Sequence, residues 1–154
     1  MLLIMEEGTI YVPEGIEDIG YKTKYSAGYD ICSNETLKIP PKTSKLVDTG
    51  IIVKLNNKNI FASLFIRSSL PGKKNLMMLN SVGIIDPDYC GREDSIKMNL
   101  YNFGETESVI EKGERIGQIV FLKFEKPELN VIHDKELLDE NNRGGFGSTD
   151  KKTN

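Results

Sequence analysis

Tryptophan is absent from the 154-residue chain, and only one histidine and two cysteines occur. Because His133, Cys32 and Cys90 are far apart, no zinc-site spacing is present, and we expect both cysteines to be reduced thiols in a cytoplasmic protein. A long apolar run is also lacking: residues 1–5 have no basic flank and stop at Glu6, too short for a secretory signal or a membrane span. The formal net charge is -3, which argues against broad binding to nucleic acid because such binding needs a basic face.

Long helical periodicity is scarce as well, and short runs of alternating and β-branched residues take its place. Turn signals such as Pro40-Pro41 and Pro71-Gly72 separate these runs. Many short strands divided in this way predict an all-β jelly roll, sandwich or barrel with one short helix, which we place near residues 71–79. We expect strands at 45–55, 60–67, 96–101 and 117–124.

The last part of the chain differs in composition. Residues 139–154 are polar and carry Gly144, Gly145 and Gly147 around a single aromatic side chain, Phe146. A frayed terminus without a role is one explanation. An exposed aromatic ring on a flexible arm needs something to cover, however, and this favours a functional arm. We therefore divide the chain into one core domain, 1–138, and a flexible glycine-rich arm, 139–154.

Arg67-Ser68-Ser69 has the chemistry of an anion site. The motif follows an apolar run and places a guanidinium and two hydroxyls at an expected strand-to-helix junction, where free N–H groups also suit an anion. The alternative is that a serine caps the helix and Arg67 lies on the surface.

The segment 80–89 reads as a hairpin arm that leads into an acidic turn. Gly83 would let the backbone approach a flat ligand closely. Asp86 follows two isoleucines that we expect to be buried, so its carboxylate could project from an apolar wall and act as a general base on a water molecule. The alternative is an ordinary turn aspartate before Pro87.

Two further motifs are weaker. In the segment 113–118, Gln118 offers both a donor and an acceptor, and in 27–31, Asp30 begins an expected strand. Taken alone, the first is more typical of a hairpin and the second of a structural strand.

Taken in order, these motifs closely resemble those of the homotrimeric dUTPase family. They read Ala-Gly-Tyr-Asp (27–30), Arg-Ser-Ser (67–69), Gly-Ile-Ile-Asp-Pro-Asp-Tyr (83–89), Gly-Glu-Arg-Ile-Gly-Gln (113–118) and Gly-Gly-Phe-Gly-Ser-Thr (144–149). The resemblance implies a jelly-roll or distorted β-barrel subunit, a homotrimer with shared active sites, and hydrolysis of dUTP to dUMP and pyrophosphate. Such an activity keeps uracil out of DNA and supplies dUMP for thymidylate synthesis.

The resemblance also implies a role for each motif. Asp86 matches the carboxylate that activates the water attacking the α-phosphorus, Tyr89 matches the ring under the deoxyribose, and Asp30 would support the site. In the family the triphosphate and water hold Mg²⁺, the implied cofactor, without direct side-chain ligands. The substrate-binding residues implied in this way are Arg67, Ser68, Ser69, Asn80, Gly83, Ile85, Tyr89, Gln118, Arg143, Phe146, Gly147, Ser148 and Thr149.

Within the arm, Phe146 would stack on uracil, Ser148 and Thr149 would bind the phosphates, and Arg143 would meet the γ-phosphate. The arm departs from the family pattern, because Asn141 and Asn142 stand at the usual Arg and Gly positions. Whether Arg143 replaces the usual arginine is left open by the shift.

A second departure is the segment Arg92–Ser95, which we interpret as an insertion that lengthens a hairpin near the uracil pocket, with Lys97 as a candidate pocket residue.

Three rival hypotheses remain for the function of the chain. A dCTP deaminase would carry a catalytic glutamate on the next strand, where residues 96–100 hold no carboxylate. A non-catalytic relative would bind dUTP to switch a protein partner, and a purely structural jelly roll would bind no nucleotide.

Overall fold

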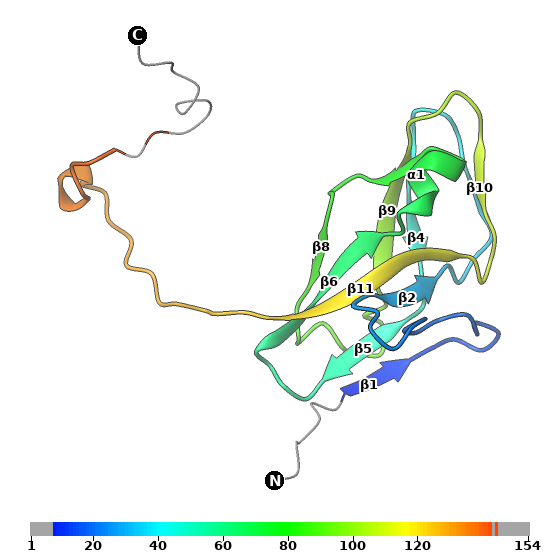
Figure 1. The fold of residues 1–154 in the computed structure, drawn as a ribbon, viewed down its shortest axis with the longest axis horizontal. Coiled ribbons are helices and arrows are strands. Elements are labelled where there is room, and N and C mark those ends of the chain that lie inside the picture. The colour runs from blue at the N-terminus through cyan, green and yellow to red at the C-terminus, as the bar shows by residue number, and fades with distance from the viewer. Residues whose placement is uncertain (1–7, 143, 145–154) are drawn as a thin grey trace.

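Short strands make up most of the regular structure in residues 8–142 and 144, the part of the chain that the computed structural model describes (Figure 1). The single α-helix of this part and a 3-10 turn complete the set. The elements are β1 (Gly8–Tyr11), β2 (Tyr29–Cys32), β3 (Leu37–Ile39), β4 (Ser44–Asp48), β5 (Ile52–Leu55), β6 (Ile60–Ile66), α1 (Ser69–Lys74), β7 (Leu76–Met78), β8 (Gly83–Ile85), β9 (Lys97–Asn102), β10 (Ser108–Ile110), β11 (Arg115–Lys123) and η1 (Lys135–Leu137).

The strands form antiparallel sheets in which chain neighbours are rarely sheet neighbours. A four-stranded sheet has the order β2-β11-β6-β8, and a three-stranded sheet has the order β4-β9-β7. Two-stranded pairs, β1 with β5 and β3 with β10, complete the fold. The prediction of an all-β jelly roll with one short helix is confirmed.

The two larger sheets face each other across the core. Leu64 and Ile119 from the four-stranded sheet and Leu100 from the three-stranded sheet are all buried in one hydrophobic cluster. The sheets lie close together at Gly117 of β11, where an added Cβ would lie 2.6 Å from Sδ of Met98 on β9. The absence of a side chain at Gly117 therefore lets the sheets pack closely at the end of β11 that carries the fourth motif.

Two of the sequence predictions have wrong boundaries. The helix spans Ser69–Lys74, because Asn75 adopts the left-handed conformation at φ 54° and its N–H donates to Pro71 O, after which β7 begins. The predicted strand 45–55 is divided at Thr49 and Gly50. Gly50 has φ +65°, and the chain leaves the three-stranded sheet there to pair with β1.

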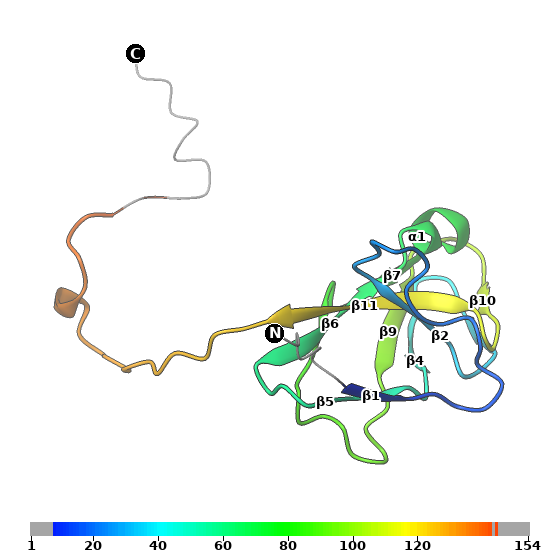
Figure 2. The ribbon, with the colours of Figure 1, turned by 60° about the horizontal axis from the view of Figure 1, so that its bottom comes forward.

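The chain leaves the body of the molecule after β11. Phe124 N still donates to Asn59 O at 3.1 Å, and the segment beyond it extends away from the sheets in both views (Figures 1 and 2). Leu129 and Val131 on this segment are 82% and 76% exposed. The single chain therefore leaves both of these apolar side chains open to solvent.

No helix in the described residues is long and apolar enough to cross a membrane.

Candidate active site

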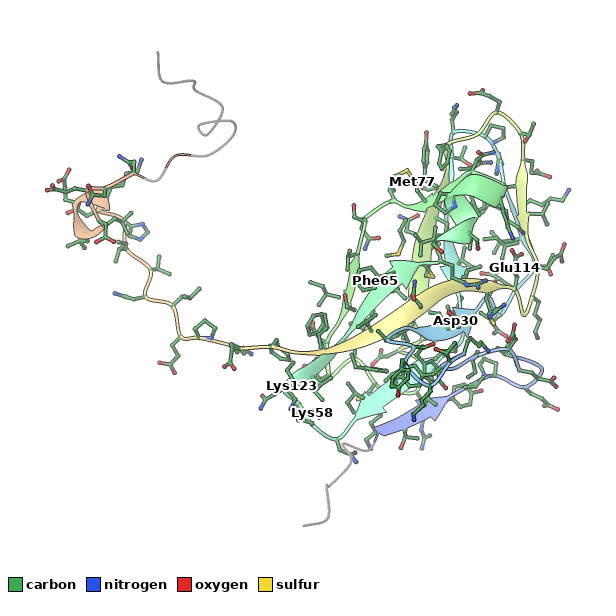
Figure 3. The ribbon with its side chains drawn as sticks, viewed as in Figure 1. Asp30, Lys58, Phe65, Met77, Glu114 and Lys123 are labelled. Carbon is green, nitrogen blue, oxygen red and sulfur yellow. The ribbon has the colours of Figure 1, made fainter. Side chains whose placement is uncertain are left out.

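One half of the candidate site lies on the outer face of the four-stranded sheet. Gln118 on β11 stands opposite Asp30 on β2 and opposite Phe65 on β6 (Figure 3). Side chains directly across a ladder point to the same face, and Ile119, the next residue, points into the core. Arg67 lies two residues beyond Phe65 and so continues this face. Three of the predicted site residues, Asp30, Arg67 and Gln118, are thus brought together.

Charges organise this half of the site. Asp30 is buried, and its Oδ2 accepts from Nη1 of Arg115 at 3.0 Å. Nε of Arg67 lies 3.8 Å from the same oxygen. The carboxylate of Asp30 therefore lies between two guanidinium groups on this face.

The backbone of the first motif lies directly against Gln118. An added Cβ at Gly28 would be 3.0 Å from Gln118 Cδ and closer still to Oε1. Any larger residue at Gly28 would displace the Gln118 amide. The close contact with Gln118 therefore explains why the first motif has glycine at position 28.

A small cavity of about 140 Å³ opens beside this cluster. Its lining is rich in cations, and Ser69 of α1 contributes to it. Ser68 precedes α1 but makes no side-chain cap hydrogen bond, so the capping alternative is wrong and its exposed hydroxyl is available to a ligand. The lining residues are Arg67, Ser69, Leu70, Lys73, Lys74, Glu114 and Arg115.

Sequence reasoning overlooked Lys73, Lys74 and Arg115 in this cavity. Lys74 is already paired, since its Nζ lies 2.6 Å from Glu114 Oε2 and also donates to Val109 O. The sequence does contain evidence for these cations, because two lysines follow Arg-Ser-Ser within one short helix and Arg115 lies inside the fourth motif.

The other half of the candidate site lies around Asp86. Asp86 is exposed at the end of β8 and lines a cavity of about 640 Å³ together with Lys58, Phe124 and Lys126. The expected pair of buried isoleucines is wrong for this chain: Ile84 is 69% exposed and Ile85 is half-buried. The reason is that successive side chains of a strand point to opposite faces: Ile85, opposite Ala62, packs against the core, and Ile84 points to the other face of the sheet.

Asp86 and Arg67 lie at opposite ends of the four-stranded sheet. Ile85 pairs with Ala62, so Asp86 is level with Phe61, six residues before Arg67. At about 3.3 Å per residue, roughly 20 Å of strand separate the two levels. Figure 3 shows the same separation, with Lys58 near one end of β11 and Glu114 near the other. A single chain therefore does not bring Asp86 next to Arg67 and Gln118.

The segment 80–89 is not a paired hairpin. β7 before it pairs with β9, β8 within it pairs with β6, and the exposed turn at Asn80 carries the chain from one sheet to the other. An added Cβ at Gly83 would lie 3.0 Å from Leu64 Cβ. Packing on Leu64 therefore requires a glycine at this position.

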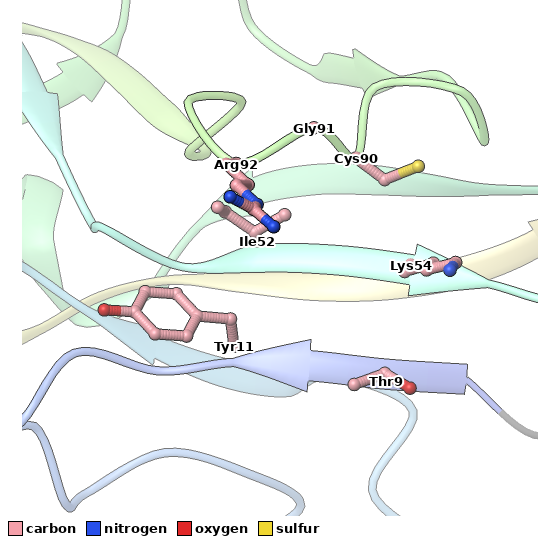
Figure 4. A pocket seen from close by; sticks show the side chains of 7 residues that line it. All are labelled: Thr9, Tyr11, Ile52, Lys54, Cys90, Gly91 and Arg92. Carbon is pink, nitrogen blue, oxygen red and sulfur yellow. The ribbon is translucent and has the colours of Figure 1, made fainter.

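The insertion Arg92–Ser95 also does not lengthen a hairpin. It forms a tight loop on Tyr89, whose OH donates to Ser95 O at 3.1 Å, while Gly91 N donates to Asp94 Oδ2 at 2.7 Å. Nζ of Lys97 donates to Ser95 Oγ at 2.9 Å, so Lys97 supports this loop. The loop also borders an apolar cavity of about 390 Å³ against Tyr11 and Ile52 (Figure 4).

Both cysteines are free thiols, and neither carries a predicted role. Cys32 is buried, and its Sγ donates to Asp18 O at 3.3 Å. Burial raises the pKa of the Cys32 thiol to about 11, so it remains protonated at neutral pH. The remaining predicted residues, Arg143, Phe146, Gly147, Ser148 and Thr149, lie outside the described part of the chain.

Known proteins resemble this chain over most of its length. A family model described as dUTPase matches residues 14–150. The deoxyuridine 5'-triphosphate nucleotidohydrolase of Lactococcus lactis subsp. lactis (strain IL1403) is 40% identical over 144 residues, which cover 92% of this chain and 93% of the relative. The protein of the same name from Escherichia coli (strain K12 / DH10B) is 32% identical over 134 residues, 86% of each chain.

Solved structures agree with the sequence matches. The crystal structure of a dUTPase from Streptococcus mutans superposes with a TM-score of 0.70 at 32% identity, covering 77% of this chain and 98% of that one. A Staphylococcus bacteriophage 80alpha dUTPase with dUPNHPP superposes with a TM-score of 0.78 at 25% identity, covering 94% and 98%. The matched span, the identities and the shared jelly roll lead to one conclusion: the chain belongs to the dUTPase family.

Proposed function

We propose that this enzyme hydrolyses dUTP to dUMP and pyrophosphate at sites shared between copies of the chain in a homotrimer. Membership of the dUTPase family supports the reaction. The observation that carries the shared site is the separation of Asp86 from Arg67 and Gln118 along the four-stranded sheet. Because these groups must act on one triphosphate, the second half of each site has to come from another copy.

Exposed apolar surface supports the assembly. Leu46 and Met77 on the three-stranded sheet are 60% and 42% exposed. The extended segment after β11 exposes Leu129 and Val131. Surfaces of this kind are covered when subunits associate.

In the proposed mechanism Asp86 orients a water molecule and removes its proton as the water attacks the α-phosphorus. An exposed carboxylate at the rim of a large cavity can reach such a water. Arg67, Ser68, Ser69 and Gln118 of another copy would hold the phosphate chain in line for the attack. Asp30 keeps Arg67 oriented, so catalysis depends mainly on positioning and charge neutralisation.

Mg²⁺ is part of the proposal. Within residues 8–142 and 144, no group of three His, Cys, Asp or Glu side chains could hold a metal ion directly. As the resemblance to dUTPases implies, the ion would take its ligands from the triphosphate and from water, beside a cluster of cations and hydroxyls. Bound in this way, Mg²⁺ supplies further neutralisation of the phosphate charge.

The segment that holds Asn80, Gly83 and Ile85 would read uracil, largely through backbone groups. A close-fitting pocket excludes the 5-methyl group of thymine by bulk, and cytosine would leave buried polar groups unpaired. Tyr89, fixed by its hydrogen bond to Ser95, would pack under the deoxyribose and exclude a 2′-hydroxyl. The product dUMP would feed thymidylate synthesis, and removal of dUTP would keep uracil out of DNA.

The core domain 1–138 and the arm 139–154 would have separate tasks. We propose that the arm closes over the bound nucleotide, with Phe146 on uracil, Gly147, Ser148 and Thr149 on the phosphates, and Arg143 near the γ-phosphate. The free thiols of the described chain suit a cytoplasmic enzyme.

Pyrophosphate release from dUTP, dTTP, dCTP and UTP with Mg²⁺ tests the proposal, comparing the wild type with Asp86→Asn. We expect activity on dUTP alone and a loss of several orders of magnitude in the variant, on the order of the 10³ or more typical of a removed catalytic base. Equal rates in the two proteins would show that Asp86 does not activate the water. Ammonia release from dCTP would instead identify a deaminase.

A further inference from the structure

Asp18 belongs to none of the motifs, yet it connects to the phosphate-binding cluster through ion pairs. Its Oδ2 lies 2.9 Å from Nε of Arg115. Nη1 of Arg115 donates to Asp30 Oδ2 at 3.0 Å, and Nε of Arg67 lies 3.8 Å from that same oxygen. Four side chains of alternating charge thus lead from an exposed loop to the arginine expected to bind phosphate.

The loop that carries Asp18 is fastened to β2 at two points. The thiol of Cys32 donates to Asp18 O at 3.3 Å. Gly20 and Asp30 exchange backbone hydrogen bonds of 3.0 and 3.1 Å. These contacts hold the Asp18 backbone in register with the strand that carries Asp30, so its carboxylate meets Arg115 in a defined place.

Arg115 is suited to link two carboxylates because its guanidinium presents several N–H groups in a rigid plane. One edge serves Asp18 and the other serves Asp30. Arg115 occupied in this way fixes the Asp30 carboxylate. Arg67 then has one fixed anion beside it, at a distance that leaves most of its hydrogen-bonding capacity for a ligand.

The charge of Asp18 is secure at neutral pH. A hydrogen bond from Lys22 at 2.7 Å, together with the nearby Arg115 and Arg67, holds the pKa of Asp18 below its usual range. Because Asp18 is exposed, its ion pairs contribute little to stability. A role in orienting other groups accounts for the arrangement better than a role in folding.

We infer that Asp18 and Arg115 are positioning residues: Asp18 orients Arg115, Arg115 fixes Asp30, and Asp30 aims Arg67 at the phosphates of the substrate. The inference rests on the proposed function. It concerns only how the phosphate chain is held, and it makes no claim on the uracil pocket.

The test compares Asp18→Asn with Lys22→Gln in the full-length protein. Both changes remove the Asp18–Lys22 ion pair, but only the first removes the charge that faces Arg115. We expect Asp18→Asn to raise the KM for dUTP about fivefold, the scale of one exposed ion pair, with kcat changed much less. Lys22→Gln should behave as the wild type. Arg115→Lys, which keeps the charge but cannot serve two carboxylates in one plane, should show at least the defect of Asp18→Asn.

Two further measurements separate positioning from a structural defect. Inhibition by deoxyuridine, which carries no phosphate, should be unchanged in Asp18→Asn, whereas inhibition by dUDP should weaken.

The inference is overturned if Asp18→Asn matches Lys22→Gln and the wild type, or if deoxyuridine and dUDP weaken by the same factor. A large defect in Arg115→Lys with none in Asp18→Asn would also overturn it, because Arg115 would then contact phosphate directly. A wild-type protein without dUTP hydrolysis would instead refute the proposed function.

Discussion

Gly28→Ala is a small change that should disable the site without unfolding the protein. The added methyl carbon would lie 3.0 Å from Gln118 Cδ and closer still to Oε1. Non-bonded carbons normally meet at about 3.5–4.0 Å, so the Gln118 amide has to retreat by on the order of 1 Å. Misplacement by about 1 Å of a group that orients substrate can cost about 100-fold in rate.

Initial rates of pyrophosphate release from dUTP measure this effect, with Gly72→Ala as the matched control. A Cβ at Gly72 would meet nothing within 4 Å, so the same substitution there should leave the rate unchanged. The free energy of unfolding should fall by no more than about 1 kcal/mol in Gly28→Ala, because the displaced amide can move outward from the sheet.

A double variant completes the test of Gly28. If Gly28 acts only through Gln118, adding Gly28→Ala to Gln118→Ala should have no further effect on the rate. Wild-type activity in Gly28→Ala would refute the reasoning, because the amide would then not need its present position.

Further predictions concern the arm and the thiols. Deletion of the chain after Asn142 should strongly lower turnover of dUTP while the far-ultraviolet circular dichroism stays unchanged; normal turnover would exclude the arm as a lid. At pH 8, iodoacetamide should modify Cys90 in the native protein and spare Cys32, whose raised pKa of about 11 against 9.0 means about a hundredfold less thiolate. Modification of both thiols at equal rates would contradict the burial of Cys32. Because the thiol of Cys32 ionises more readily in the unfolded chain, the free energy of unfolding should also decline as the pH rises from 9 toward 11.

Much of the site could be predicted because its residues form local motifs. Asp30, Arg67 and Gln118 were expected to act together because their motifs, taken in order, resemble those of the dUTPase family, and the register of β2, β11 and β6 brings them to one face. The strands that carry Arg67 and Gln118 were also expected within two residues of their observed bounds. Both strands are short runs rich in apolar and β-branched residues between turn signals, a pattern that indicates a strand without knowledge of its neighbours in the sheet.

The pairing of strands could not be predicted in the same way. β7 and β8 follow each other in the chain, yet they belong to different sheets, so the expected hairpin at 80–89 was wrong. Alternation tells which side chains are buried but not which strand lies alongside. Ile84 illustrates a related problem: it is apolar but lies on the face of β8 opposite to the core, and it is exposed in the single chain.

The link from Asp18 to Arg115 had no local signal at all. The two residues come from the loop before β2 and from the start of β11, and only the antiparallel pairing of those strands brings them together. Long-range ion pairs of this kind follow from topology, so they become visible only in the structure.

Complementation between two inactive variants tests the shared site most directly. Asp86→Asn and Arg67→Gln would be co-expressed with different tags, and the mixed trimers would be isolated and assayed with dUTP. If Asp86 and Arg67 of one site come from different subunits, every mixed trimer has one site in which both groups are intact, so the isolated mixed trimers should show about one third of the wild-type activity. If both groups of a site came from the same chain, the mixture would be no more active than the two variants alone, and that result would contradict the account.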